Sequence, residues 1–185
     1  MKRCTWVTDD PLYINYHDTE WGVPAHDDRH LFEMLILEGA QAGLSWITIL
    51  KKRAHYKKLF YDFNVQKVAK MTDAQLDKIL LDPGIIRNRL KIYGTRKNAL
   101  ATLELLKTET SLNDYLWNWV NHQPILNHFK DFSDIPTQTP LSEAISKDLK
   151  KRGFTFVGPT IIYAYMQAVG MVNDHTANCC CAPIR

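Results

Sequence analysis

Two cysteines and two histidines stand near opposite ends of the sequence, and their side chains suit a metal ion. Cys4 and His17 lie near the start, and His175 and Cys179 lie near the end. Two thiolates and two imidazoles form a standard donor set for a closed, tetrahedral zinc site. The spacing of His175 and Cys179 fits one helical turn or a tight loop, which places both side chains on one side. The pattern predicts one structural Zn²⁺ that clips the two ends of the chain together.

The spacing of these residues does not determine which of the cysteines and histidines are the ligands. Cys180 and Cys181 follow directly after Cys179 and could substitute as ligands. The separation of Cys4 and His17 is wider than in a zinc finger, so surface cysteines and unrelated histidines are the alternative explanation.

A second group of residues is aromatic and crowds the first 46 positions. Aromatic residues in loops suggest a pocket for a flat ligand, because stacking on such a ring contributes roughly 1–3 kcal/mol per nucleobase. Taken without any family resemblance, the residue types favour the alternative that these rings belong to the hydrophobic core. The group consists of Trp6, Tyr13, Tyr16, Trp21 and Trp46.

Glu38 interrupts the apolar segment LFEMLILEGAQAGLSW. A carboxylate buried in such a helix must be paired or functional, because burying it alone is costly. Glu38 could accept hydrogen bonds from the amino group of a base and would stabilise a positively charged ligand. An exposed glutamate near the helix end is the alternative. Further along, Gly43 permits a turn with Leu44 at its tip, where Leu44 is either a wedge for a base stack or an ordinary core residue.

The segment ILLDPGIIRNRLKIYGTRKNAL predicts a helix, a hairpin and a second helix. The hairpin is Asp82-Pro83-Gly84, a sequence that forces a tight turn. Arg87 and Arg89 follow it, and backbone N–H groups at the start of a helix bind phosphate. A phosphate-binding site on DNA is one interpretation of this segment, and a solvated basic helix face is the other.

Helical periodicity dominates the chain and no segment alternates with a period of two, so we expect an all-α fold. Asp27 or Asp28, Ser45, Thr72 with Gln75, and Ser111 are candidate helix caps. We expect Gly39 and Gly43 to weaken the helix that carries Glu38. Further helices are expected over residues 88–107, 142–152 and from Pro159 to Gly170, with a loop over 121–141.

The expected organisation is a single domain, residues 1–185, with two lobes. Residues 35–120 would form a central helical lobe with the hairpin near 81–90. The segments 1–30 and 121–185 would form the zinc-stapled lobe. A length of 185 residues supports a core without disulfides.

The composition excludes few partners. A net charge of +3 permits a nucleic-acid partner without requiring one. No apolar run approaches the roughly 18 residues of a membrane span, and the N-terminus lacks the apolar region of a signal peptide. We therefore expect a cytoplasmic monomer that has free or metal-bound cysteines and no membrane partner.

The sequence resembles the 3-methyladenine DNA glycosylase I family of the helix-hairpin-helix glycosylase superfamily. The similar segments run in order from RCTWV at residue 3 to NDHTANCCC ending at residue 181. They include DPLYINYHDTEWGVP, LFEMLILEGAQAGLSWITIL, DPGIIRNRLKI, WVNHQP, LKKRGFTFVGPTI and VNDH.

The resemblance implies roles for the residues singled out above. It assigns the zinc ligands to Cys4, His17, His175 and Cys179. It assigns the base pocket to Trp6, Tyr13, Tyr16, Trp21, Glu38 and Trp46, with Glu38 as the catalytic residue, and the DNA plug to Gly43 and Leu44. In the hairpin only Gly84 is present where the superfamily has two glycines. Neither the usual catalytic aspartate nor a lyase lysine is evident, which implies a monofunctional enzyme.

The resemblance also implies an activity, the release of 3-methyladenine from double-stranded DNA that contains alkylated adenine, by base flipping and hydrolysis of the N-glycosidic bond. Two other classes remain open at this point. The chain could be a damage-binding module that does not cut, or a zinc hydrolase. The sequence contains no His-Glu-x-x-His motif, and four protein ligands would leave no open zinc position for water.

Overall fold

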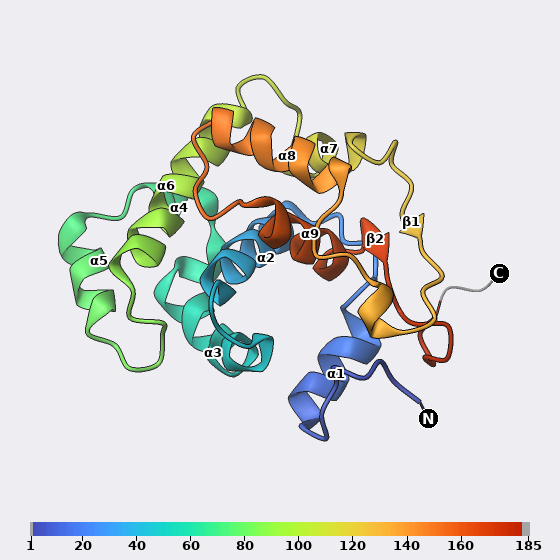
Figure 1. Cartoon of the computed structure of the whole chain (residues 1–185). Helices are drawn as coiled ribbons and strands as arrows, with labels where there is room; N and C mark the ends of the chain where they lie inside the picture. Colours follow the sequence, from blue (N-terminus) through green and yellow to red (C-terminus); the bar gives the residue numbers. More distant parts are fainter. Residues whose placement is uncertain (1, 183–185) are drawn as a thin grey trace.

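Two buried helices lie at the centre of the molecule. In the computed structural model, which describes residues 2–182, α2 (Asp28–Gln41) packs against α9 (Pro159–Ala168), as Figure 1 shows. Every residue from Leu31 to Ala40 is buried. The Tyr165 hydroxyl of α9 donates a hydrogen bond to the carbonyl oxygen of Leu31 at 3.1 Å. Because α2 is covered on all sides, its apolar residues do not follow the one-sided pattern of a surface helix.

The remaining helices surround this pair (Figure 1), and the expectation of a mainly helical fold is confirmed. α8 packs on α9, and α6 packs on α4, α5 and α2. Their bounds are α3 Trp46–Leu59, α4 Val65–Ala69, α5 Asp73–Leu80, α6 Arg89–Leu105, α7 Leu112–Asn118 and α8 Pro140–Lys151, with short 3₁₀ turns η1 Tyr61–Phe63 and η2 Phe132–Asp134.

Most of the predicted helix starts are confirmed by their caps. Asp27 accepts a hydrogen bond from the His30 N–H, and Thr72 forms the expected capping box with Gln75. Ser45 is different, because its hydroxyl pairs with Thr48 at 2.7 Å and caps no backbone N–H group.

Two expectations about the helices were wrong, one about a helix start and one about a glycine inside a helix. α8 begins at Pro140 and not at residue 142, because Thr139 caps it and proline suits the first helical position. Gly39 does not weaken α2, which continues to Gln41. A side chain at residue 39 would approach Cβ of Phe156 to 3.0 Å, so glycine serves close packing there.

The N-terminal region also differs from the prediction of loops. Residues Pro11–Thr19 form the helix α1, in which Asp10 is the cap and Pro11 occupies the first turn. The predicted loop over 121–141 contains η2 and the two-residue strand β1 (Ile125–Leu126), which pairs in parallel with β2 (Val172–Asn173).

The two ends of the described chain meet. The N–H of Cys180 donates to the carbonyl oxygen of Lys2 at 2.8 Å. Among the helices of residues 2–182, none has the length and apolar character that a membrane span needs. The division into two lobes stays a prediction.

Candidate active site

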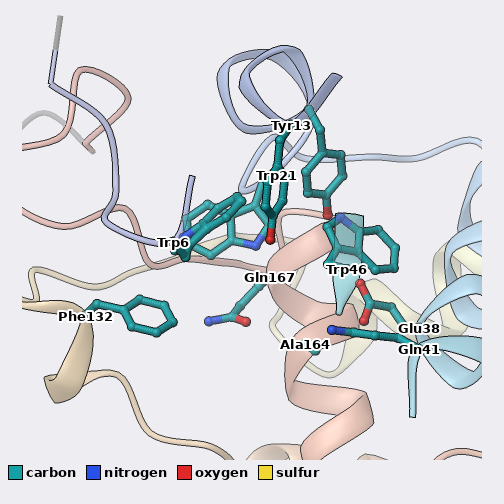
Figure 2. A pocket seen from close by; sticks show the side chains of 10 residues that line it. Trp6, Tyr13, Trp21, Glu38, Gln41, Trp46, Phe132, Ala164 and Gln167 are labelled. Carbon is teal, nitrogen blue, oxygen red and sulfur yellow. The ribbon is translucent and has the colours of Figure 1, made fainter. Parts of the chain in front are cut away.

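A cavity of about 180 Å³ opens between α1, α2, α3, α9 and η2. Figure 2 shows aromatic rings on one side of it, polar groups of α2 beside them, and Phe132 across from them. All six residues predicted for the base pocket line this cavity. The complete lining is Trp6, Tyr13, Tyr16, Trp21, Glu38, Gln41, Trp46, Phe132, Ala164 and Gln167.

The aromatic residues form tilted walls. The ring centroid of Trp6 lies 5.0 Å from that of Tyr13 and 5.0 Å from that of Trp21, with interplanar angles of 55° and 70°. Tyr16 and Trp46 are 5.4 Å apart at 52°. In these three pairs the rings are not stacked in parallel, so a flat ligand can still lie against an open ring face.

The prediction that these rings occupy loops was wrong for three of them. Tyr13 and Tyr16 lie on α1, and Trp46 is the first residue of α3. For the two tyrosines the sequence gave no sign of a helix, because α1 is short and its helical periodicity is weak; for Trp46 the candidate cap Ser45 already indicated a helix start. Tyr16, Trp21 and Trp46 are buried, so the core and pocket interpretations both apply to these rings.

Two indole groups in the pocket lack hydrogen-bond partners within the described residues. Nε1 of Trp6 and Nε1 of Trp46 are buried and unpaired. An unpaired buried donor is costly. A ligand that brings acceptor atoms into the pocket would therefore gain free energy by satisfying them.

Glu38 is buried, with 4% of its surface exposed, which excludes the alternative of an exposed glutamate. Burial raises the pKa of its carboxyl to about 8, and no described basic side chain offsets this effect. Glu38 is therefore largely protonated at neutral pH in the free protein. A cation placed in the pocket would stabilise its carboxylate form.

Burial also raises the pKa values of the Tyr13 and Tyr16 phenols, with a contribution from the nearby Glu38 carboxyl. Both phenols stay protonated at neutral pH and keep their O–H donors.

Four lining residues were not predicted from sequence. Gln41 lies almost one helical turn after Glu38, and Gln167 lies one turn after Ala164, so helical spacing could have suggested these neighbours. Phe132 lines the cavity and is 46% exposed. The sequence did not indicate this position, because the path of the loop that carries Phe132 cannot be derived from the sequence pattern.

Gln167 is held in place by Asp174. Its side-chain amide donates to Asp174 Oδ2 at 2.8 Å, and the Tyr163 hydroxyl donates to the same oxygen at 2.7 Å. Asn127 occupies the other carboxylate oxygen at 2.7 Å. This network fixes the polar side of the pocket opposite the rings.

The predicted metal ligands converge behind the pocket. The ligand atoms of His17, His175, Cys179 and Cys181 all lie within 4.8 Å of one another. His17 Nε2 is 3.3 Å from the sulfur of Cys179. Cys4 is buried beside them, its sulfur 3.7 Å from the Thr176 hydroxyl, and its thiol also contacts His17 and Cys179. The structure thus brings all four predicted ligands into one cluster and places the alternative, Cys181, in the same cluster.

Hydrogen bonds orient the two histidines so that each Nε2 can act as a metal ligand. His17 Nδ1 donates to Asp18 at 2.7 Å, and His175 Nδ1 donates to the Asn173 side-chain oxygen at 2.9 Å. Each Nε2 therefore carries a lone pair, and that of His175 is buried with no partner among the described residues. Such outer hydrogen bonds orient metal-binding histidines. This donor set fits a zinc ion.

The cluster also supports the pocket walls. The ring of His175 packs 4.6 Å from Trp21, and the ring of His17 packs 5.3 Å from Trp6. An ion that ordered these histidines would order the two tryptophans.

The predicted plug residues, Gly43 and Leu44, follow the C-cap of α2 at Ala42. Gly43 has a positive φ of 79°, a conformation that favours glycine, and the Leu44 N–H donates to the Gln41 carbonyl. The Leu44 side chain is 41% exposed. The alternative of a buried core leucine is excluded, and an apolar side chain stands exposed in the turn between two lining residues of the pocket, Gln41 and Trp46.

The predicted hairpin links α5 to α6 and rests on α3. Asp82 accepts a hydrogen bond from the Gly84 N–H at 2.7 Å, and Lys52 of α3 donates to the Pro83 carbonyl at 3.0 Å. A Cβ at Gly84 would meet the His55 ring at 2.5 Å, so this position requires glycine.

The two arginines predicted to bind DNA differ in their surroundings. Arg87 is exposed and has no hydrogen-bond partner among the described side chains. Arg89 pairs with Asp77 at 2.7 Å and stacks over Tyr93, with its guanidinium carbon 4.3 Å from the ring centroid. Arg87 is thus the freer of the two.

Comparison with known proteins gives consistent matches over nearly the whole chain. The profile of the methyladenine glycosylase family matches residues 6–182. DNA-3-methyladenine glycosylase 1 of Escherichia coli (strain K12) is 53% identical over 183 residues, which cover 99% of this chain and 98% of the relative.

Solved structures agree with these matches. A crystal structure of 3-methyladenine DNA glycosylase I has a TM-score of 0.96 at 50% identity, covering 98% of this chain and 100% of the other. A second structure, of 3-methyladenine DNA glycosylase I from Staphylococcus aureus, concerns the recognition of 3-methyladenine. It has a TM-score of 0.96 at 38% identity, covering 100% of this chain and 98% of the other.

Proposed function

The chain belongs to the methyladenine glycosylase family, and from this premise we propose that it is a DNA-repair enzyme that removes 3-methyladenine from DNA. The reaction is hydrolysis of the N-glycosidic bond, which leaves an apurinic site and free 3-methyladenine. The single observation that carries the proposal is the aromatic cavity with one buried carboxyl, Glu38, which no basic side chain within residues 2–182 pairs.

The pocket suits a flat cation. Methylation at N3 places a positive charge on the adenine of DNA, and ring faces attract cations. The charged base would lower the pKa of Glu38 and convert it to a carboxylate beside the ligand. A neutral adenine would leave Glu38 protonated and forgo that attraction. The site thereby selects the damaged base by charge.

Hydrogen bonds add to this selection. The Glu38 carboxylate can accept from the exocyclic amino group of adenine, which a 6-keto purine lacks. The unpaired N–H groups of Trp6 and Trp46 offer donors to ring nitrogens. Unmatched polar groups in a buried site penalise the wrong base.

The chemistry needs little acid catalysis, because the cationic base is already a good leaving group. The C1′–N9 bond breaks with its electron pair going to the base, and the sugar acquires oxocarbenium character. Water then forms the new C1′–O bond and gives up a proton to solvent. The carboxylate of Glu38 would hold the base in place through these steps, and the surrounding rings exclude other water.

The base must leave the duplex before it can reach the cavity, since its glycosidic bond is hidden by stacking. We assign the wedge to Leu44, in the turn between two residues that line the pocket, and the backbone contacts to the hairpin at Gly84 with Arg87 and Arg89, as in a helix-hairpin-helix motif. Double-stranded DNA is therefore the proposed substrate. A DNA substrate is compatible with the cytoplasmic location and monomeric state expected from sequence.

A zinc ion is proposed as a structural component. His17, His175 and Cys179 would hold it, with Cys4 or Cys181 as the fourth ligand. A closed four-ligand shell supplies order to the chain ends and leaves no position for a reactive water.

Base release tests the proposed function directly. The purified protein is incubated with methylated duplex DNA, and the released bases are identified by mass. Free 3-methyladenine together with alkali-labile sites in the DNA is expected. Tight binding of the DNA without base release would instead identify a damage-binding module. A zinc hydrolase would lose activity with its metal and not with Glu38→Gln.

A further inference from the structure

Lys91 of α6 is bound to the end of α2. Its ammonium donates to the carbonyl oxygens of Ala40 at 2.8 Å and Ala42 at 2.7 Å. Carbonyls at a helix C-terminus have no partner within the helix and carry partial negative charge. α2 has no basic side chain in its last turn, and the N–H of its C-cap residue Ala42 makes no capping bond. The Leu44 N–H pairs with the Gln41 carbonyl and not with those of Ala40 and Ala42. Lys91 supplies the cap that the sequence of α2 lacks.

The capped end of α2 leads directly into the Gly43–Leu44 turn. This turn has few other restraints. A side chain at Gly43 would meet nothing within 4 Å, and Leu44 is largely exposed. The hydrogen bond from the Leu44 N–H to Gln41 orders the turn only relative to α2. The position of the turn relative to the rest of the molecule thus depends strongly on Lys91.

The backbone of Lys91 is fixed to the hairpin. Its N–H donates to the side chain of Asn88 at 3.1 Å, which caps α6 at the exit of the hairpin. Phe156 packs against both Gly39 of α2 and Gly94 of α6, which holds the two helices close together. Lys91 therefore connects the hairpin, which would contact the DNA backbone, to the Gly43–Leu44 turn, which would enter the base stack.

We propose that Lys91 is a positioning residue that holds Leu44 in register with the hairpin, so that backbone binding and base flipping occur together. The proposal rests on the function proposed above. Two of the three N–H groups of the Lys91 ammonium are already used by carbonyls, so direct phosphate binding is the less favoured role and becomes an outcome of the test.

The first experiment compares Lys91→Met, which keeps the aliphatic stem and removes the donors, with wild type. We expect kcat/KM on methylated duplex DNA to fall about tenfold, the scale of one hydrogen bond to a charged group. Binding of free 3-methyladenine should change less than about twofold, since the pocket walls do not involve Lys91. Lys107→Met is the matched control, because Lys107 follows the same helix and pairs only with Glu104 on the surface.

A double-mutant cycle with Leu44→Ala tests the route of the effect. If Lys91 acts through Leu44, then Lys91→Met should lower activity less than about twofold in the Leu44→Ala background. Fully additive losses would overturn the proposal. Equal losses in free-base binding and in duplex excision would also overturn it, as would a lowered salt slope of DNA binding, which would identify a phosphate contact.

Hydrogen exchange supplies a readout that does not depend on activity. The Leu44 amide should exchange faster in Lys91→Met than in wild type, and an unchanged rate would contradict the role of Lys91. If wild type released no base, the proposed function would fail while this measurement still tested the positioning. Lys91→Gln keeps an amide donor and should therefore lose less kcat/KM than Lys91→Met. If Lys91→Met does not fold, Lys91→Gln replaces it in every comparison.

Discussion

At the scale of single residues, Glu38 is the group to which we assign recognition of the cationic base. Its carboxyl is buried without a basic partner, an arrangement that costs stability in the ionised form. Most glutamates in such surroundings would be paired, as Glu33 is with Arg53 at 2.7 Å on the same helix. The contrast between these two glutamates of α2 indicates that Glu38 is suited to bind a cationic ligand.

Binding of a fixed cation should depend on pH through Glu38. Adenine methylated at both N3 and N9 is a permanent cation that mimics the lesion. Because Glu38 must lose a proton to face it, we expect the affinity of wild type to rise up to about tenfold for each pH unit between about pH 6 and pH 8. Glu38→Gln should bind more weakly by roughly 1–3 kcal/mol near pH 8 and show no such slope. Titrations of both proteins across this range test the role, and parallel pH profiles would contradict it.

Glu38 should also make the stability of the protein depend on pH. Its pKa rises from an ordinary 4.5 to about 8 on folding. The stabilisation from its protonated form is therefore fully present below pH 4.5 and is lost as the pH rises toward 8. Glu38→Gln should become more stable than wild type across this window, by as much as about 5 kcal/mol. Urea unfolding of both proteins near pH 5 and pH 8 measures the difference, and other titrating groups cancel in the comparison.

At the scale of elements, the site combines short segments from distant parts of the chain. α1 supplies two rings, the end of α2 supplies Glu38 and the plug turn, and η2 supplies Phe132. The hairpin is held against α3 by Lys52 and His55. α3 therefore connects the Trp46 wall of the pocket to the proposed DNA-binding segment, and a shift of this helix would disturb both.

The hairpin arginines should differ in their effect on DNA binding. Arg87 is exposed and unpaired among the described side chains, whereas Arg89 is engaged by Asp77 and Tyr93. Arg87→Ala should weaken binding to all duplexes alike and reduce the slope of log Kd against log salt by about 1. Arg89→Ala should reduce the slope less, because its charge is already balanced. Binding measured at several salt concentrations decides this, and an unchanged slope in Arg87→Ala would remove that residue from the interface.

At the scale of the whole molecule, the two ends of the chain form one unit behind the pocket. The first residues and the segment from Asn173 to Cys181 share the Cys/His cluster, a backbone hydrogen bond at Lys2, and packing against Trp6 and Trp21. Arg3 holds Asp18 with a bidentate contact, and Asp18 in turn orients His17. Order in this cluster is thus transmitted to the base pocket.

The metal prediction follows from this arrangement. We expect one zinc per chain and a clear loss of it in Cys179→Ser, together with a fall in stability of several kcal/mol. Base-release chemistry at saturating substrate should change much less. Cys4→Ser and Cys181→Ser, compared by metal analysis, identify the fourth ligand, with the exposed Cys180→Ser as control. Full metal retention in Cys179→Ser would exclude that residue as a ligand.

Much of the local structure could be predicted from sequence because its causes are local. The capping box of Thr72, the proline that opens α9 and the turn at Asp82-Pro83-Gly84 depend on neighbouring residues only. The family resemblance extended this to the pocket, and all six predicted pocket residues line one cavity. The predicted membership of the family is confirmed.

Other features depend on contacts between segments distant in the chain, which the sequence pattern does not encode. The path of residues 121–139 that brings Phe132 to the pocket depends on the pairing of β1 with β2. The raised pKa of Glu38 depends on what covers α2, and the choice between Cys4 and Cys181 depends on how the ends meet. Lys91 looks like one more surface cation in the sequence, and only its approach to the two carbonyls of α2 gives it a separate role. Burial and long-range hydrogen bonds arise from the packed chain, so the sequence determined the types of chemical group and the tertiary structure decided their environment.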